Sequence, residues 1–263
     1  MLFAAGMGIG LMFFGVSEPL SHFGSAFGGT AMENGVRTDW APLGAAAGDA
    51  EAATRLGMAA TIYHWALHPW AIYAILALGL ALFSFNKGLP LTVRSVFYPL
   101  LAERVWGWPG HVIDILAVLA PLFGLATSLG YGAAQASSGL NFLFDVPLGN
   151  TTQIVLVIGI TAIALFSVVA GLDAGVKRLS EINMMLAVLL LVFVIAVGPT
   201  LDILSGFFGN LGAYFQHLPA LSNPVGRDDA NFSQGWTAFY WAWWISWSPF
   251  VGMFIARVSR GRT

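Results

Sequence analysis

The chain has 263 residues, of which 57% are hydrophobic and only 9% are charged, and its mean hydropathy is +0.76. Soluble domains contain about 25% charged residues, so this composition excludes an ordinary water-facing surface and predicts a membrane protein. The net charge is −2 and no basic cluster is present, which excludes a nucleic-acid-binding surface. The absence of cysteine excludes disulfides, thiolate catalysis and cysteine-ligated metals.

Six apolar stretches are long enough to cross a hydrocarbon core about 30 Å thick, which needs roughly 20 helical residues. They predict membrane spans at residues 1–17, 60–86, 110–134, 151–172, 182–207 and 235–256. The first stretch lacks the basic leader and cleavage site of a signal peptide, so we expect a span there. The sequence therefore predicts an all-α integral membrane protein.

The segments between these spans also carry predictions. Residues 21–50 are rich in glycine and alanine, and we expect an external loop that leads into an amphipathic helix. Residues 87–109 contain Trp106 and Trp108, whose side chains suit the headgroup region of a bilayer. The polar and aromatic mixture of residues 208–222 predicts a helix that lies along the outer surface.

The basic residues give the predicted spans an orientation. Eight of the eleven follow alternate spans, namely Lys87, Arg94, Arg104, Lys177, Arg178, Arg257, Arg260 and Arg262. Arg37, Arg55 and Arg227 fall on the other side. By the positive-inside rule, the first span runs outward and the segment after the sixth span is cytoplasmic.

Four glycines stand close together in the first predicted span, at Gly6, Gly8, Gly10 and Gly15. Such a run either lets helices pack closely or leaves the helix unwound, so that backbone groups bind an ion or a solute. A dinucleotide-binding motif is excluded, because no strand precedes the run and no acidic residue follows in a βαβ unit. The glycines alone leave both readings open.

Large aromatic side chains gather in two other spans. In "HWALHPWAIY", Trp65, Trp70 and Tyr73 fit on one arc of a helix, and Pro69 disturbs the backbone between them. The segment "FYWAWWISWSPF" and the residues before it carry a second group. Its aromatic residues are spaced by four, three and four and so form one stripe on a helix: Trp236, Tyr240, Trp243 and Trp247, with Trp244 beside the stripe.

The depth of these aromatic residues decides between two explanations. An interfacial belt explains Trp236 and Tyr240, whereas Trp244 and Trp247 lie two turns further into the span. Aromatic rings at depth suit a quaternary ammonium group, which has no N–H to donate and is attracted by ring faces with ~2 kcal/mol or more per desolvated contact. Such a cage needs no buried counter-charge, and Asp114 and Glu18 lie near span ends, where snorkelling or capping explains them.

Other chemistries fit less well. His64 and His68 have the spacing of a metal-binding pair, but no second histidine pair completes a di-iron membrane site. Ser246 and Ser248 lack a paired base, which argues against nucleophilic catalysis. We expect these serines to satisfy the backbone groups that Pro249 frees.

The motifs resemble those of one transporter family. The segment "GWTAFYWAWWISWSPFVGMFIARVSRGRT", together with "AAGMGIG" and "HWALHPWAIY", is similar to the betaine/choline/carnitine transporters, and the resemblance covers essentially the whole chain. It implies a LeuT-like core of two inverted five-helix repeats, preceded by two helices. Residues 1–207 would form the first repeat, 208–234 an external helix and loop, and 235–263 the first helix of the second repeat. The first two and last four of the family's twelve helices would lie outside this chain.

The resemblance also implies a binding site. The ammonium box would consist of Trp65, Trp70, Tyr73 and Trp244, and Trp247 would belong to the same pathway. Trp243 and Phe239 would flank the route inward.

Further positions concern the choice of solute and ion. Gly10 stands where choline-type members have an aspartate, which resembles the betaine-type pattern. Backbone groups around Ala4 and Met7 would contribute to a sodium site. Pro121 and Leu125 replace two threonines of a second sodium site, so proton coupling or exchange stays open.

The sequence thus predicts a secondary transporter with alternating access rather than an enzyme. In this interpretation the ammonium group of the solute binds among the indoles, and its carboxylate meets exposed N–H groups of a broken first span. We expect it to import glycine betaine, with choline or carnitine as alternatives, by symport with Na⁺ or H⁺, in osmoprotection. We expect no cofactor and no resident metal, contact with membrane lipid, a homotrimer, and a place in the bacterial inner membrane. The alternatives are an inverted-repeat symporter for amino acids or nucleobases, an exchanger of the same family, and a membrane enzyme or sensor.

Overall fold

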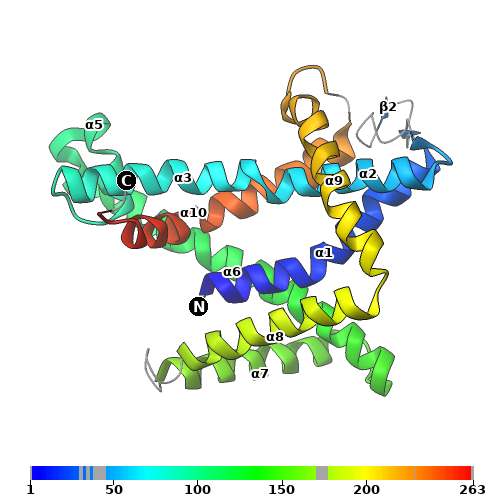
Figure 1. Cartoon of the computed structure of the whole chain (residues 1–263). Helices are drawn as coiled ribbons and strands as arrows, with labels where there is room; N and C mark the ends of the chain where they lie inside the picture. The colour runs from blue at the N-terminus through cyan, green and yellow to red at the C-terminus, as the bar shows by residue number, and fades with distance from the viewer. Residues whose placement is uncertain are drawn as a thin grey trace. The chain divides into compact units, whose positions relative to one another are not determined.

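The computed structural model describes residues 2–29, 32–33, 36–37, 46–169, 177–227 and 229–261 (Figure 1). These residues form two compact units, one of Met1–Ser17 with Ala126–Gly212 and one of Glu18–Leu125 with Ala213–Thr263. The boundary falls inside α1 (Leu2–Gly28), α6 (Trp108–Phe144) and α9 (Thr200–Ser222). The described chain is helical apart from loops and an antiparallel pair of two-residue strands, β1 (Met32–Glu33) and β2 (Val36–Arg37).

The first unit contains α7 (Asn150–Val169) and α8 (Lys177–Val197) besides parts of the shared helices. The start of α1 packs on α6, because Phe13 and Phe14 place their ring centroids 4.9 and 5.1 Å from that of Tyr131. Gln135 of α6 also donates from Nε2 to the Met12 carbonyl at 3.0 Å. The apolar side chains of α7 and α8 are mostly exposed, as expected of helices that lipid covers.

The second unit is built around α2 (Ala50–Trp65), α3 (Leu67–Ala81) and α10 (Ala238–Val258). Asp49 caps α2 by accepting from the backbone N–H groups of Glu51 and Ala52, both at 3.0 Å. Smaller elements complete the unit: π-helical turns at Leu82–Asn86 and Asn231–Thr237, α4 (Val93–Val96), α5 (Tyr98–Leu101) and a 3₁₀ turn at Ala102–Trp106.

Glycines permit the close packing in this unit. A Cβ on Gly252 of α10 would lie 3.1 Å from Leu76 Cγ of α3, and one on Gly57 of α2 would lie 3.0 Å from the backbone nitrogen of Phe23 in α1. Both crossings are therefore so close that a side chain at either glycine requires the neighbouring helix to shift by a few tenths of an ångström.

Four of the predicted spans are confirmed by helix length and composition. Among the described residues, the segments apolar and long enough to cross a membrane are Ala50–Asn86, Trp108–Phe144, Asn150–Val169 and Lys177–Val197. The described part of the predicted span 1–17 lies in α1, and the predicted span 235–256 covers the end of the π-helical turn Asn231–Thr237 and most of α10; their crossing of the membrane stays a prediction.

Several boundaries differ from the sequence predictions; the helix of the predicted span 110–134, for example, continues to Phe144. The span predicted to continue to residue 207 ends at Val197, and α9 begins at Thr200, because Pro199 lacks the N–H that continues a helix. The loop predicted from residue 21 begins later, since α1 runs to Gly28. Much of the rest of that loop, and Arg262 of the charge pattern, lie outside the described residues.

We predict that Gly252→Val lowers the thermal unfolding midpoint of the complete transporter by several degrees, because the added methyl groups meet Leu76 at the crossing of α10 and α3. Gly159→Val is the control, because a Cβ at Gly159 of α7 meets no atom within 4 Å. The measurement is thermal unfolding in detergent. Equal midpoints for both variants would contradict the close packing.

Candidate functional site

The site begins with a break in the helix that carries the first aromatic residues. The α2 helix ends at Trp65, Ala66 departs from helical geometry with φ −99° and ψ −116°, and α3 starts at Leu67. Pro69 explains the break, because it has no N–H for the Trp65 carbonyl and its ring crowds that group. The predicted disturbance by Pro69 is thus confirmed.

Trp244 connects α10 to the backbone at this break through a hydrogen bond. Its indole Nε1 donates to the backbone carbonyl of His64 at 2.9 Å, near the end of α2. The indole is 1% exposed, so the hydrogen bond fixes the ring in a dry environment. The backbone break therefore also sets the orientation of the Trp244 ring.

Rings from α2, α3 and α10 converge beside the break. The centroid of Trp65 lies 5.1 Å from that of Trp244 at an interplanar angle of 77°, and Tyr73 lies 6.3 Å from Trp244 at 80°. Trp243 stacks on Trp244 with centroids 5.2 Å apart. We call Trp65, Tyr73, Trp243 and Trp244 the ring cluster.

Two predicted residues lie at the margins of this cluster. The ring centroids of Trp70 and Tyr73 lie 5.9 Å apart in an edge-on arrangement, but Trp70 is 54% exposed. Trp247 is buried one turn further along α10, 6.4 Å from the Phe250 ring. It packs on α6, where a Cβ at Gly124 would lie 2.9 Å from the Trp247 Nε1.

The serines of α10 both bond to backbone carbonyl groups. Pro249 offers no N–H to the carbonyl of Ile245, and Ser248 Oγ donates to that carbonyl at 2.8 Å. Ser246 Oγ donates to the Trp243 carbonyl at 2.7 Å, which Pro249 does not free. The prediction that these serines satisfy the backbone groups freed by Pro249 is therefore confirmed for Ser248 and wrong for Ser246.

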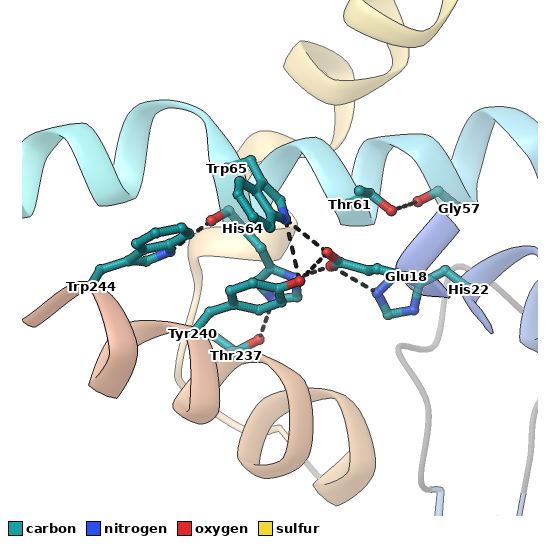
Figure 2. Close-up of polar contacts among 9 residues, drawn as sticks. All are labelled: Glu18, His22, Gly57, Thr61, His64, Trp65, Thr237, Tyr240 and Trp244. Carbon is teal, nitrogen blue, oxygen red and sulfur yellow. Dashed lines mark hydrogen bonds and ion pairs between the residues drawn. The ribbon is translucent and has the colours of Figure 1, made fainter. Parts of the chain in front are cut away.

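Next to the ring cluster lies a buried carboxylate, that of Glu18 (Figure 2). Its Oε2 accepts from Trp65 Nε1 at 2.9 Å and from the Tyr240 hydroxyl at 2.5 Å. Its Oε1 faces His64 Nδ1 at 2.5 Å and His22 Nε2 at 3.3 Å. We call Glu18, His22, His64, Trp65 and Tyr240 the carboxylate network.

The prediction that Glu18 snorkels or caps near a span end is wrong. Its side chain is fully buried, because its hydrogen-bond partners on α2 and α10 enclose it. The belt explanation of Tyr240 is also wrong, since Tyr240 is 0% exposed and bonds to this carboxylate. Of these contacts, the spacing of four between Glu18 and His22 was the signal visible in the sequence.

The hydrogen bonds to Glu18 favour the ionised form of its carboxyl group. Donors on both oxygens favour the charged form of a buried carboxyl group, because they replace the hydrogen bonds of water. An ionised carboxylate only accepts, so the facing ring nitrogens carry hydrogen. His64 Nε2 then lies 2.9 Å from Thr237 Oγ1.

The same groups resemble a metal-ligand set, because ligand atoms of Glu18, His22 and His64 lie within 4.8 Å of one another. Their facing atoms are already joined as donor and acceptor, so a metal ion would have to replace these hydrogen bonds. The spacing of His64 and His68 makes no pair, because His68 Nε2 instead faces Ser222 Oγ at 3.2 Å. The arrangement fits hydrogen bonding better than metal binding.

The glycine stretch differs from the expected broken helix. α1 is helical through Ala4, Met7 and Gly10, so the predicted unwinding, which would free N–H groups for a solute carboxylate, is wrong for this structure. Glycine weakens a helix by only about 1 kcal/mol relative to alanine and keeps its N–H, unlike proline. Gly10 is buried within the first unit.

Comparison with known proteins gives a consistent result. A family model described as betaine/carnitine/choline family transporter matches residues 1–263. The chain is 76% identical over 263 residues to a glycine betaine/proline/choline transporter of Vibrio parahaemolyticus and 57% identical over 265 residues to glycine betaine transporter 1 of that organism. It is 45% identical over 268 residues to the glycine betaine transporter OpuD of Bacillus subtilis. Each alignment covers 100% of this chain and 48 or 49% of the relative, so the chain spans about half the length of these relatives.

We predict that Trp244→Phe lowers the thermal unfolding midpoint, because phenylalanine keeps a ring but leaves the buried His64 carbonyl without its donor, a loss of about 1–3 kcal/mol. Trp70→Phe is the matched control, because the Trp70 side chain is mostly exposed. Thermal unfolding of both variants in detergent checks the expectation. A midpoint for Trp244→Phe no lower than that of the control would show that this bond contributes little.

Proposed function

The chain belongs to the betaine/carnitine/choline transporter family, and we propose that its ring cluster binds the quaternary ammonium group of glycine betaine during import. The observation that supports this most is the convergence of Trp65, Tyr73 and Trp244 from separate helices beside a helix break. A methylated ammonium cannot donate a hydrogen bond, so its recognition depends on ring faces and charge.

The family and the helices of the chain support a membrane transporter rather than an enzyme. The family and the similar proteins are transporters, and several described helices are long and apolar enough to span a bilayer. The relatives named above are bacterial, and their names specify glycine betaine, with proline and choline in one case. These names support a betaine-type solute for the complete protein.

The residues near the proposed site also bear on which ammonium compound is transported. Gly10 carries no charge, which suits a zwitterion that brings its own carboxylate better than a solute with net positive charge. We propose glycine betaine first, with choline and carnitine as alternatives, and a homotrimer in lipid as the working assembly. An amino-acid symporter would need polar side chains at the position of the indoles, which makes that alternative weaker.

Coupling by symport and alternating access are likewise proposed. Backbone groups near Ala4 and Met7 would contribute to a sodium site, and ion binding would favour the outward-facing state only through a difference in affinity between states. Pro121 and Leu125 offer no side-chain oxygen for a second sodium site. Proton coupling or exchange is therefore the alternative to sodium symport.

We predict that Trp244→Leu in the complete transporter raises the half-saturation concentration for glycine betaine at least about tenfold, because about 1.4 kcal/mol lies within one desolvated cation–π contact. The measurement is uptake of labelled glycine betaine into vesicles. Trp108→Leu is the control, because Trp108 is 77% exposed and lies at the start of α6. Unchanged uptake by Trp244→Leu would count against the cage.

We also predict that labelled glycine betaine is taken up at lower concentration than choline or carnitine, and that an inward sodium gradient raises its rate of uptake. Each solute is measured with sodium, with potassium and with a pH gradient. Uptake driven by the pH gradient alone would reject sodium symport, and uptake that depends on internal solute would indicate exchange.

A further inference from the structure

The carboxylate network joins segments that are distant in the sequence. Glu18 belongs to α1, His64 and Trp65 to the end of α2, and Tyr240 to α10. The carboxylate is 0% exposed, and both of its oxygens are engaged. A buried charge with this number of donors is held in one place, because each displaced donor would lose a charge-assisted hydrogen bond.

Two of these donors link Glu18 to the ring cluster: Trp65 belongs to the cluster, and Tyr240 contacts it. The Trp65 indole, which donates to Glu18, has its ring centroid 5.1 Å from that of Trp244. The Tyr240 ring, whose hydroxyl donates to the same oxygen, lies 5.6 Å from Trp65 and 6.0 Å from Trp244. Any movement of the Glu18 oxygen therefore changes how both rings face Trp244.

We propose that Glu18 is a positioning residue for the ammonium site, acting through the Trp65 N–H and the Tyr240 O–H. This inference rests on the proposed function, since it assumes that the ring cluster binds a methylated ammonium. The carboxylate fixes the tilt of the Trp65 indole and stands behind it as a fixed negative charge. A charge-assisted hydrogen bond also polarises its donor, so the indole face becomes more attractive to a cation.

The other side chains of the network support this role. His22 and His64 bind the second oxygen, so the carboxylate cannot rotate away from Trp65 without losing bonds at both oxygens. Thr237 Oγ1 faces the far nitrogen of His64 at 2.9 Å and anchors that ring to the start of α10. A network satisfied at each of these positions is rigid.

A purely structural Glu18 would also stabilise the unit, so the experiment must separate the two roles. Trp65→Phe keeps an aromatic ring, although a smaller one, and removes the indole N–H that donates to Glu18 and also lies 3.3 Å from the Tyr240 hydroxyl. If Glu18 acts through that N–H, then Glu18→Gln must matter less once the N–H is absent. A double-mutant cycle on the half-saturation concentration measures this dependence.

The experiment uses the complete transporter and labelled glycine betaine, with Glu18→Gln, Trp65→Phe and the double variant. We expect Glu18→Gln to raise the half-saturation concentration about fivefold or more in the wild-type background and less than about twofold in the Trp65→Phe background. In Glu18→Gln, the maximal velocity per folded transporter should change by a smaller factor than the half-saturation concentration for glycine betaine. Glu51→Gln is the matched control, because Glu51 is an exposed carboxylate on α2 that pairs with Arg55.

Two results would overturn the proposal: a half-saturation concentration unchanged by Glu18→Gln, or the same fold-change in both backgrounds. If Glu18→Gln does not fold, Tyr240→Phe takes its place, since it removes one donor to Glu18 and keeps the ring. Tyr240→Phe should also raise half-saturation, and less so when combined with Trp65→Phe. The proposal would again be overturned if Tyr240→Phe left the half-saturation concentration unchanged, or if the fold-changes of Tyr240→Phe and Trp65→Phe simply multiplied in the double variant.

The two proposals fail in distinguishable ways. If Trp244→Leu leaves the uptake of glycine betaine unchanged, the cage itself is wrong. If Trp244→Leu weakens uptake while Glu18→Gln behaves as Glu51→Gln does, the cage stands and the positioning role of Glu18 falls.

Discussion

The second unit depends on one electrostatic constraint, the burial of the Glu18 carboxylate. An ion of this size loses several kcal/mol of hydration when it leaves water, so it stays charged only where donors replace the water. His22, His64, Trp65 and Tyr240 supply these donors. Helices that are mostly apolar can pack in several registers, whereas a register that separates these donors from Glu18 leaves a buried charge unsatisfied. The network thus favours one crossing of α1, α2 and α10.

The backbone around Ala66 extends this constraint to the ring cluster. Pro69 divides one apolar segment into α2 and α3, and the end of α2 carries Trp65, whose side chain bonds to Glu18. The carbonyl of His64 at the same place accepts from Trp244. The buried charge therefore orients Trp65 and the broken backbone orients Trp244, which a continuous helix with apolar neighbours would not do.

The sequence predicted the parts of this structure that depend on local or composition signals. Apolar length predicted the long helices, Pro69 predicted the break, and Pro249 predicted the role of Ser248. Pro199 could have predicted the end of α8, but the apolar residues on both sides of it favoured one span. Trp65, Tyr73 and Trp244 were assigned to one site through the family resemblance, since spacing alone could not place α3 against α10. Glu18 was missed because its partners on α2 and α10 lie 46, 47 and 222 residues away.

If the ring cluster binds an ammonium group as proposed, the buried carboxylate changes how such a site selects its solute. The sequence predicts that aromatic rings alone bind the ammonium group, because the spans offer almost no counter-charge. In the structure, a carboxylate lies 2.9 Å from the Trp65 Nε1, on the edge of an indole whose ring meets Trp244. A carboxylate in direct contact with the ammonium would favour solutes with net positive charge and repel the acidic end of a zwitterion. A carboxylate that acts through an indole attracts the ammonium and remains bonded to its own donors, so the site gains negative potential without presenting a bare anion to the solute.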